Sequence, residues 1–307
     1  MIFKRSIQGT TGVGDYQGDF LKVRDFLRQF QKDAYTHLVF PWGRWEWMFS
    51  LPYFDTTFIH KIYVWEKEEQ IVALATYESS FGEGYYVIHP SCEYLKAEVG
   101  ETIINEYMHL GKVRMLIPNQ DALMQRIARQ HGLVPTSSKE EDALFDLDQT
   151  PLEYELPEGF EVVSLKDDFS LLKYHNVLWK GFGHSGEVEN MEELLPMRKV
   201  SLSGIDVNLA YLWAVRSQTG EFVSYCGMWY IPNDHCALVE PVATDPEFRK
   251  MGLGKACVLS ALARVKQDGA KVAIVGSSQE FYYKIGFSPL ETSTWWEKTS
   301  GNDSPAR

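Results

Sequence analysis

Residues 238–256 read LVEPVATDPEFRKMGLGKA, an apolar strand that passes through an Asp-Pro pair into a glycine-rich turn and then a helix. Such a turn leaves the first backbone N–H groups of the helix unpaired, and the helix dipole adds partial positive charge at the same place. Gly252 and Gly254 allow close approach to the backbone, and Arg249 supplies a permanent cation with forked donors. The stretch therefore predicts a binding site for a pyrophosphate group.

The turn itself, Arg249-Lys250-Met251-Gly252-Leu253-Gly254, resembles the coenzyme A signature of the GNAT superfamily of N-acetyltransferases, an Arg/Gln-x-x-Gly-x-Gly/Ala pattern after the fourth strand. A glycine-rich turn alone also opens helices in many other α/β proteins. Here, however, residues 281–287, FYYKIGF, resemble the superfamily's late helix, in which a Phe-Tyr pair precedes a Gly-Phe pair. Two motifs in the expected order make the resemblance specific.

The sequence around these motifs agrees with alternating strands and helices. Val258, Ala261, Leu262 and Val265 lie at helical spacing, so one face of that helix packs on a sheet, and Gly269 is placed to end it. Pro241 lies inside a strand pattern and points to an edge or a bulge, because proline cannot donate to a β-ladder. In the C-terminal half the pattern predicts strands at 160–165, 209–216, 221–230, 236–244 and 271–275, and helices at 169–180 and 190–199.

The resemblance implies an α/β (α+β) fold with two GNAT-like domains, each a mixed, mostly antiparallel central sheet flanked by helices. It also implies acetyl-CoA as cosubstrate, with its pantetheine arm in a wedge beside strand 236–244 and on the backbone N–H groups of Val242 and Thr244. The residues expected to bind coenzyme A are Val242, Ala243, Thr244, Arg249, Lys250, Met251, Gly252, Leu253, Gly254 and Lys255. No metal is expected, since no His/Cys cluster has ligand spacing.

The N-terminal half contains a weak repeat of the C-terminal half. His89-Pro90 takes the place of Asp245-Pro246, and Gly132-Leu133 takes the place of Gly286-Phe287. The glycine-rich turn is replaced by residues 91–98, SCEYLKAE, whose carboxylates would repel pyrophosphate, and Ala128 occupies the position of Tyr282. We therefore expect residues 1–150 to form a diverged, noncatalytic GNAT-like domain and residues 151–307 to form the catalytic domain.

Composition limits the class of protein. The chain has 307 residues and a formal net charge of −12, so neither nucleic acid nor an anionic membrane is an expected partner, and cationic small molecules are favoured. The N-terminus lacks the apolar segment of a secretory signal, which predicts a cytoplasmic protein. The four cysteines lack CxxC spacing and are expected to be buried thiols. A monomer and a homodimer are equally compatible with the sequence.

Direct acetyl transfer to an amine needs a deprotonated nucleophile, a polarised thioester carbonyl and an acid for the departing thiolate. The N–H of Val242 is expected to bind the carbonyl. The resemblance makes Tyr282 the candidate acid, with Tyr283 as its competitor. Glu240, two residues before Val242 in an apolar strand, is either the base or a structural carboxylate with an ordinary hydrogen bond.

The sequence offers two candidate residues for binding the acceptor. His184, in a glycine-flanked loop, is a candidate substrate-binding residue together with Glu240, although an exposed loop histidine without function is the commoner case. The expected activity is an acetyl-CoA-dependent N-acetyltransferase acting on a small cationic amine. A protein lysine or N-terminal acetyltransferase and a noncatalytic acyl-CoA-binding module remain as alternatives.

Overall fold

The structure is a computed structural model that describes residues 1–32, 39–184 and 191–300. By their internal contacts these residues form two compact units. Unit 1 comprises residues 1–30, 39–141 and 291–300, and unit 2 comprises residues 31–32, 142–184 and 191–290.

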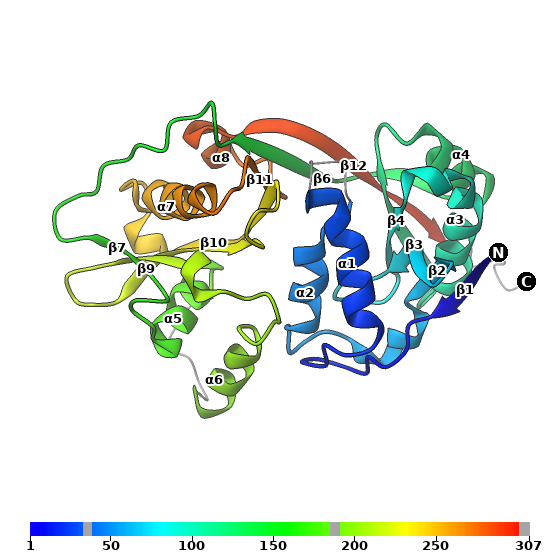
Figure 1. Ribbon diagram of the computed structural model, residues 1–307, viewed down its shortest axis with the longest axis horizontal. Coiled ribbons are helices and arrows are strands. Elements are labelled where there is room, and N and C mark those ends of the chain that lie inside the picture. The colour runs from blue at the N-terminus through cyan, green and yellow to red at the C-terminus, as the bar shows by residue number, and fades with distance from the viewer. Residues whose placement is uncertain (33–38, 185–190, 301–307) are drawn as a thin grey trace, which may run out of the picture. The chain divides into compact units, whose positions relative to one another are not determined.

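Unit 1 is a mixed, mostly antiparallel sheet with helices (Figure 1). Its strands, in spatial order, are β1 (Ile2–Ser6), β2 (Tyr63–Lys67), β3 (Gln70–Thr76), β4 (Glu83–Ile88), β5 (Lys112–Pro118) and the end of β12 (Ser288–Thr299). Only β4 and β5 pair in parallel. Its helical elements are α1 (Asp19–Lys32), α2 (Trp42–Phe49), η1 (Thr56–Lys61), η2 (Pro90–Leu95), α3 (Lys96–Glu106) and α4 (Ala122–Gln130).

Unit 2 has the same kind of sheet. Its strands, in spatial order, are the end of β6 (Val134–Asp146), β11 (Val272–Val275), β10 (Cys236–Thr244), β9 (Phe222–Trp229), β8 (Trp213–Arg216) and β7 (Glu161–Ser164). Only β10 and β11 pair in parallel. Its helical elements are α5 (Leu171–Gly181), α6 (Met191–Val200), η3 (Leu209–Tyr211), η4 (Pro246–Phe248), α7 (Leu253–Gln267) and α8 (Glu280–Ile285). The predicted fold class is confirmed.

Two strands each pair with a strand from the other half of the sequence. Residues 293–299 of β12 pair with β5 in unit 1, and residues 143–146 of β6 pair with β11 in unit 2. Both strands are long, with 12 and 13 residues, and each begins in one unit and ends in the other. The units therefore do not coincide with a single cut into 1–150 and 151–307.

The helices of unit 2 cover both faces of its sheet, with α7 on one side of β9 and β10 and α5 on the other (Figure 1). Every residue of β9 is buried, as expected for a central strand covered on both faces. The predicted apolar face of α7 packs in the larger core, where Val258, Leu262 and Val265 are fully buried. Gly269 follows the end of α7 with φ +110°, which confirms its predicted place after the helix.

One predicted strand is shorter than expected. The apolar residues 209–216 suggested a single strand, but Leu209–Tyr211 forms the short helix η3 and β8 begins at Trp213. The side chain of Asn208 accepts a hydrogen bond from the N–H of Ala210 and so starts the helical turn. The local capping bond outweighs the strand propensity of this apolar segment.

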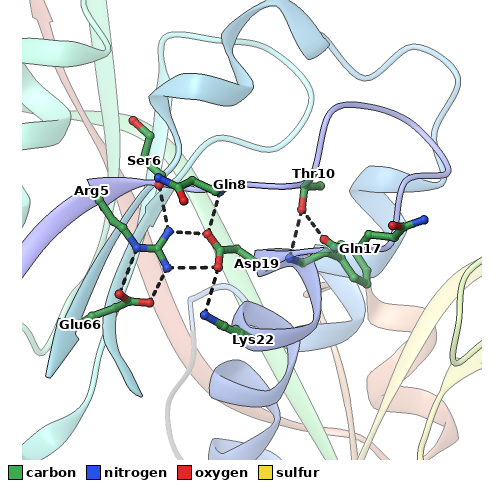
Figure 2. A network of polar contacts seen from close by, with 9 residues as sticks. Arg5, Ser6, Gln8, Thr10, Gln17, Asp19, Lys22 and Glu66 are labelled. Carbon is green, nitrogen blue, oxygen red and sulfur yellow. Dashed lines mark hydrogen bonds and ion pairs between the residues drawn. The ribbon is translucent and has the colours of Figure 1, made fainter. Parts of the chain in front are cut away.

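A buried ionic network joins β1, β2 and α1 of unit 1 (Figure 2). The Arg5 guanidinium bridges the carboxylates of Asp19 and Glu66, and the backbone N–H of Gln8 also donates to Asp19, at 2.7 Å. Burial alone would raise the pKa of Asp19, but its hydrogen bonds and the positive charge of Arg5 lower it. This network fixes the first strand of unit 1 against the first helix.

No helix among the residues that the structure describes is long and apolar enough to cross a membrane. The four cysteines, Cys92, Cys226, Cys236 and Cys257, are free and buried, as predicted.

Candidate functional site

The strand β10 separates from its parallel neighbour β11 halfway along its length. The two strands pair from Cys236 to Leu238, and no further pair follows within the described residues. On its other side β10 stays paired with β9, with a register shift between Val239 and Val242. The irregularity predicted from Pro241 is therefore present, and it coincides with the opening of a wedge between β10 and β11.

The backbone of β10 presents donors to this wedge. The N–H of Asp245 donates to Val223 of β9, at 3.0 Å. Because N–H groups alternate along a strand, the N–H of Ala243 also points toward β9, whereas those of Val242 and Thr244 point toward the wedge. This direction is the one that their expected role in binding the pantetheine arm requires.

Asp245 holds the turn that follows. Its side chain is 4% exposed, accepts a hydrogen bond from the N–H of Glu247 at 3.1 Å, and forms an ion pair with Lys180 of α5 at 3.0 Å. The short helix η4 begins at this cap. The Asp-Pro pair thus redirects the chain from the strand into the glycine-rich turn.

The start of α7 presents a group of unpaired backbone donors. The first helical bond runs from the N–H of Ala256 to the carbonyl of Gly252, the N-cap residue. Within the described part of the chain, no backbone or capping acceptor pairs with the N–H groups of Leu253, Gly254 and Lys255. With the helix dipole, these groups can bind a phosphate.

The two glycines of the turn are required for different reasons. Gly252 has φ +82°, a left-handed conformation that other residues adopt only with strain. A Cβ on Gly254 would lie 3.2 Å from the Thr244 hydroxyl and 3.4 Å from the Phe281 ring. Gly254 therefore lets the N-terminus of α7 pack closely against the end of β10 and against α8.

Arg249 lies at the edge of the turn and bonds two backbone carbonyls. Its Nη2 donates to the carbonyl of Gly181 at 2.9 Å, and its Nε donates to the carbonyl of Thr244 at 3.2 Å. The side chain thus ties the end of α5 to the end of β10. Lys250 and Lys255 beside it form no ion pair with any described residue, which makes them the freer cations at the turn. Met251 between them is exposed.

Tyr282 lies in the core with its hydroxyl unbonded. Its ring packs between Phe281 and Phe287, at centroid distances of 5.0 and 5.4 Å. The hydroxyl makes no hydrogen bond to a described residue, and solvent can reach it. Burial raises the pKa of Tyr282, and the nearby Cys226 and Glu240 raise it further. The hydroxyl is thus protonated at neutral pH and can donate a proton.

The remaining candidate residues, Glu240, Tyr283 and His184, differ in how deeply they are buried. Glu240 lies half-buried in the shifted part of β10, near enough to Tyr282 to act on its pKa. Tyr283 is partly buried against the same core as Tyr282. His184 is exposed and stacks on Trp179, with 4.1 Å between ring centroids.

In the corresponding turn of unit 1 the first N–H of the following helix is already paired. The His89 side chain accepts from the N–H of Ser91, as Asp245 does from Glu247, and the N–H of Leu133 bonds the carbonyl of Ala128 at 2.9 Å, as Phe287 bonds Tyr282 at 3.0 Å. These matched bonds support the repeat. However, η2 continues directly into α3, and the N–H of Lys96 bonds Glu93.

Side chains also fill the region beside α3. Asp121 accepts hydrogen bonds from the Tyr86 hydroxyl at 2.9 Å and from the Lys96 ammonium at 3.1 Å. The strands β4 and β5 pair only at Glu83 and Gly84. The parallel strands of unit 1 thus separate after a short paired segment, as those of unit 2 do. In unit 1, however, the Asp121 carboxylate lies near the start of α3.

One cluster of side chains on α5 and α6 was not indicated by any sequence pattern. It consists of Tyr174, His175, Trp179 and Arg198. His175 and Trp179 are four residues apart, so they share one face of α5. An aromatic and a histidine at this spacing are usually core residues, and only the structure shows that Arg198 approaches them.

Comparisons with known proteins agree with this geometry. Residues 172–287 match the model of the acetyltransferase (GNAT) family. A tandem GNAT protein from the clavulanic acid biosynthesis pathway, solved without acetyl-CoA, is similar over 99% of this chain and 100% of its own, with a TM-score of 0.60 and 12% identity.

Two further solved structures have the same fold. A GCN5-related N-acetyltransferase from Sphaerobacter thermophilus is similar over 78% of this chain and 80% of its own, with a TM-score of 0.55 and 16% identity. A GCN5-related glucosamine N-acetyltransferase region of a fungal multi-domain β-N-acetylglucosaminidase covers 97% of this chain and 38% of its own, with a TM-score of 0.53 and 12% identity. No curated protein matches the chain.

Proposed function

Since residues 172–287 match the GNAT acetyltransferase family model and the whole chain has the fold of a tandem GNAT protein, we propose that unit 2 binds acetyl-CoA and transfers its acetyl group directly to an amine of a small cationic molecule. The proposal depends chiefly on two neighbouring sets of backbone N–H donors. The N–H groups of Val242 and Thr244 face the wedge of β10, and unpaired N–H groups begin α7 at its end.

The donors match the two parts of coenzyme A. The helix start suits the pyrophosphate, with Lys250 and Lys255 as neighbouring cations, and the strand suits the amide groups of the pantetheine arm. The residues assigned to coenzyme A binding are Val242, Ala243, Thr244, Arg249, Lys250, Met251, Gly252, Leu253, Gly254 and Lys255. Arg249 is proposed to act mainly by positioning the backbone, because two of its donors already bond carbonyl oxygens.

In the proposed reaction the amine attacks the thioester carbonyl, whose oxygen accepts a hydrogen bond from the N–H of Val242. A C–N bond forms, the C–S bond breaks, and the departing thiolate takes a proton from the Tyr282 hydroxyl. Glu240 takes the proton of the amine, directly or through water. No covalent enzyme intermediate is needed.

We assign unit 1 a noncatalytic role because the N–H of Lys96 at the start of α3 is already paired and the Asp121 carboxylate lies beside it. The net charge of −12 supports a cationic acceptor and argues against nucleic acid or an anionic membrane as partner. His184 and Glu240 are the proposed contacts for the acceptor.

The test is thiol release from acetyl-CoA with polyamines, aminoglycosides, amino acids and lysine peptides, for the wild type, Tyr282→Phe and Tyr283→Phe. Amine-dependent release that Tyr282→Phe alone abolishes supports the proposal. Reaction with peptides only would favour a protein acetyltransferase. Binding of acetyl-CoA without release by any amine would favour a noncatalytic acyl-CoA-binding module.

A further inference from the structure

The cluster between α5 and α6 has no role in the proposed acetyl-CoA site. The rings of His175 and Trp179 stack on one face of α5, with centroids 5.9 Å apart, and His184 stacks on Trp179. Arg198 of α6 approaches His175 from the second helix. His175 is only 2% exposed.

One hydrogen bond fixes the protonation of the histidine. The Nε of Arg198 donates to the Nδ1 of His175 at 3.4 Å. Burial lowers the pKa of His175, and the charge of Arg198 and the neighbouring His184 lower it further, so the ring is neutral at neutral pH. Because Nδ1 accepts, the single ring proton of His175 lies on Nε2, which is therefore a donor.

Two further polar atoms of the cluster are donors without acceptors. The Nε2 of His175 and the indole Nε1 of Trp179 are closed to solvent and have no hydrogen-bond partner. Arg198 forms no ion pair with a carboxylate in the part of the chain that the structure describes. Buried donors of this kind are rare in folded proteins, because leaving them unpaired destabilises the fold.

The cluster is connected to the proposed reaction centre. Arg198 lies 5.8 Å from the centroid of the Tyr174 ring, which packs edge-on against Tyr225 of β9 at 5.1 Å. The Tyr225 hydroxyl and the carbonyl of Glu240 both lie within 3.0 Å of the position where a side chain on Gly227 would begin. A tyrosine pair thus spans the distance from the cluster to the shifted segment of β10.

We propose that Arg198, His175 and Trp179 form a subsite for a carboxylate, so that the acceptor is an amine that also carries a carboxylate, as an amino acid does. One cation and two neutral N–H donors match the single charge and two oxygens of a carboxylate, whereas a phosphate brings almost two charges. The inference rests on the proposed function and narrows its acceptor class. A diamino acid would retain the cationic side chain proposed above.

Access to the subsite involves His184. This exposed ring stacks on the Trp179 indole from outside the buried core. An acceptor that displaces His184 would reach the two buried donors. His184 then acts as a cover of the subsite and contacts the acceptor from the solvent side.

The test compares amino acids with their decarboxylated amines, such as lysine with cadaverine and ornithine with putrescine, in acetyl-CoA thiol release. We expect kcat/KM to be roughly ten- to hundredfold higher for the acids, since a hydrogen bond to a charged group contributes that much to binding. Trp179→Phe and Arg198→Gln should lower this ratio toward one, chiefly through KM. Trp213→Phe is the matched control, because the indole N–H of this partly buried tryptophan already donates to Ala210.

The outcomes separate this inference from the proposed function. Release that is equally fast with acids and amines, or a preference for acids that persists in both variants, would overturn the carboxylate subsite and leave the transferase intact. If no amine supports release, thermal shift of the whole protein with the same pairs still decides the question. Stabilisation by the acids alone, lost in Trp179→Phe, supports the subsite, and equal or absent shifts contradict it.

Discussion

Arg249 donates a hydrogen bond to the carbonyl oxygen of Gly181, with 2.9 Å between Nη2 and O. Since its Nε also bonds Thr244, one side chain connects the end of α5, the end of β10 and the turn before α7. A family resemblance suggests a cation for the pyrophosphate at this position. From these two bonds we infer that Arg249 mainly holds the backbone donors in place.

Replacing Arg249 with glutamine should raise the KM for acetyl-CoA about tenfold, because hydrogen bonds from a charged donor are lost and the turn is less rigid. The effect on kcat should be smaller. Steady-state kinetics with acetyl-CoA as the varied substrate gives both values. Lys250→Gln is the control, as it removes one positive charge from the same turn without removing a bond to α5. Equal increases in KM for the two variants would show that charge, not positioning, is what matters.

Gly252→Ala should weaken acetyl-CoA binding. Gly252 has φ +82° and Gly220, in the β8–β9 turn, has φ +83°, and a Cβ at either position would have no contact closer than 3.8 Å. Alanine at either site should therefore lower the free energy of unfolding by about 1–2 kcal/mol, the cost of a left-handed conformation. Only Gly252→Ala should also raise the Kd for acetyl-CoA, measured by calorimetry. A similar Kd in both variants would contradict the binding role of the turn.

Tyr282→Phe should lower kcat by roughly 10²–10⁴-fold, the range for loss of a general acid, while acetyl-CoA binding is unchanged. Tyr283→Phe is the matched control on the same helix and should have little effect. Because burial, Cys226 and Glu240 raise the pKa of Tyr282, its hydroxyl should remain protonated beyond the usual tyrosine pKa of about 10. The wild-type kcat should thus show no loss from this group up to about pH 10. A decline in kcat near pH 8 that disappears in Tyr282→Phe would refute the assignment.

The sequence predicted the parts of unit 2 that depend on local pattern. Gly252, Gly269 and Pro241 determine a turn, a helix end and a register shift by their own backbone restrictions, and each lies where the pattern placed it. The repeat was also visible in the His-Pro and Asp-Pro pairs, whose side chains cap matching turns.

Features that depend on contacts between distant residues could not be predicted. No pattern in the sequence around Trp295 indicates that its ring packs against Tyr85. The two residues meet only because β12 pairs with β5. In the same way, no local pattern around Arg198 points to His175, 23 residues earlier on another helix. The proposed carboxylate subsite depends on such contacts, and no local pattern indicated them.

The last prediction concerns Asp121, which accepts hydrogen bonds from Tyr86, Lys96 and the backbone N–H of Met124 in unit 1. Asp121→Asn keeps the helix cap but removes the charge beside Lys96, whose side chain is only 14% exposed. The free energy of unfolding should fall by about 1–3 kcal/mol, measured by urea denaturation. Asp148→Asn, at an exposed pair with Lys271, should change it by less than about 1 kcal/mol. Neither variant should alter the KM for acetyl-CoA if unit 1 is noncatalytic, so a change in KM with Asp121→Asn alone would mean that the region beside α3 takes part in coenzyme A binding.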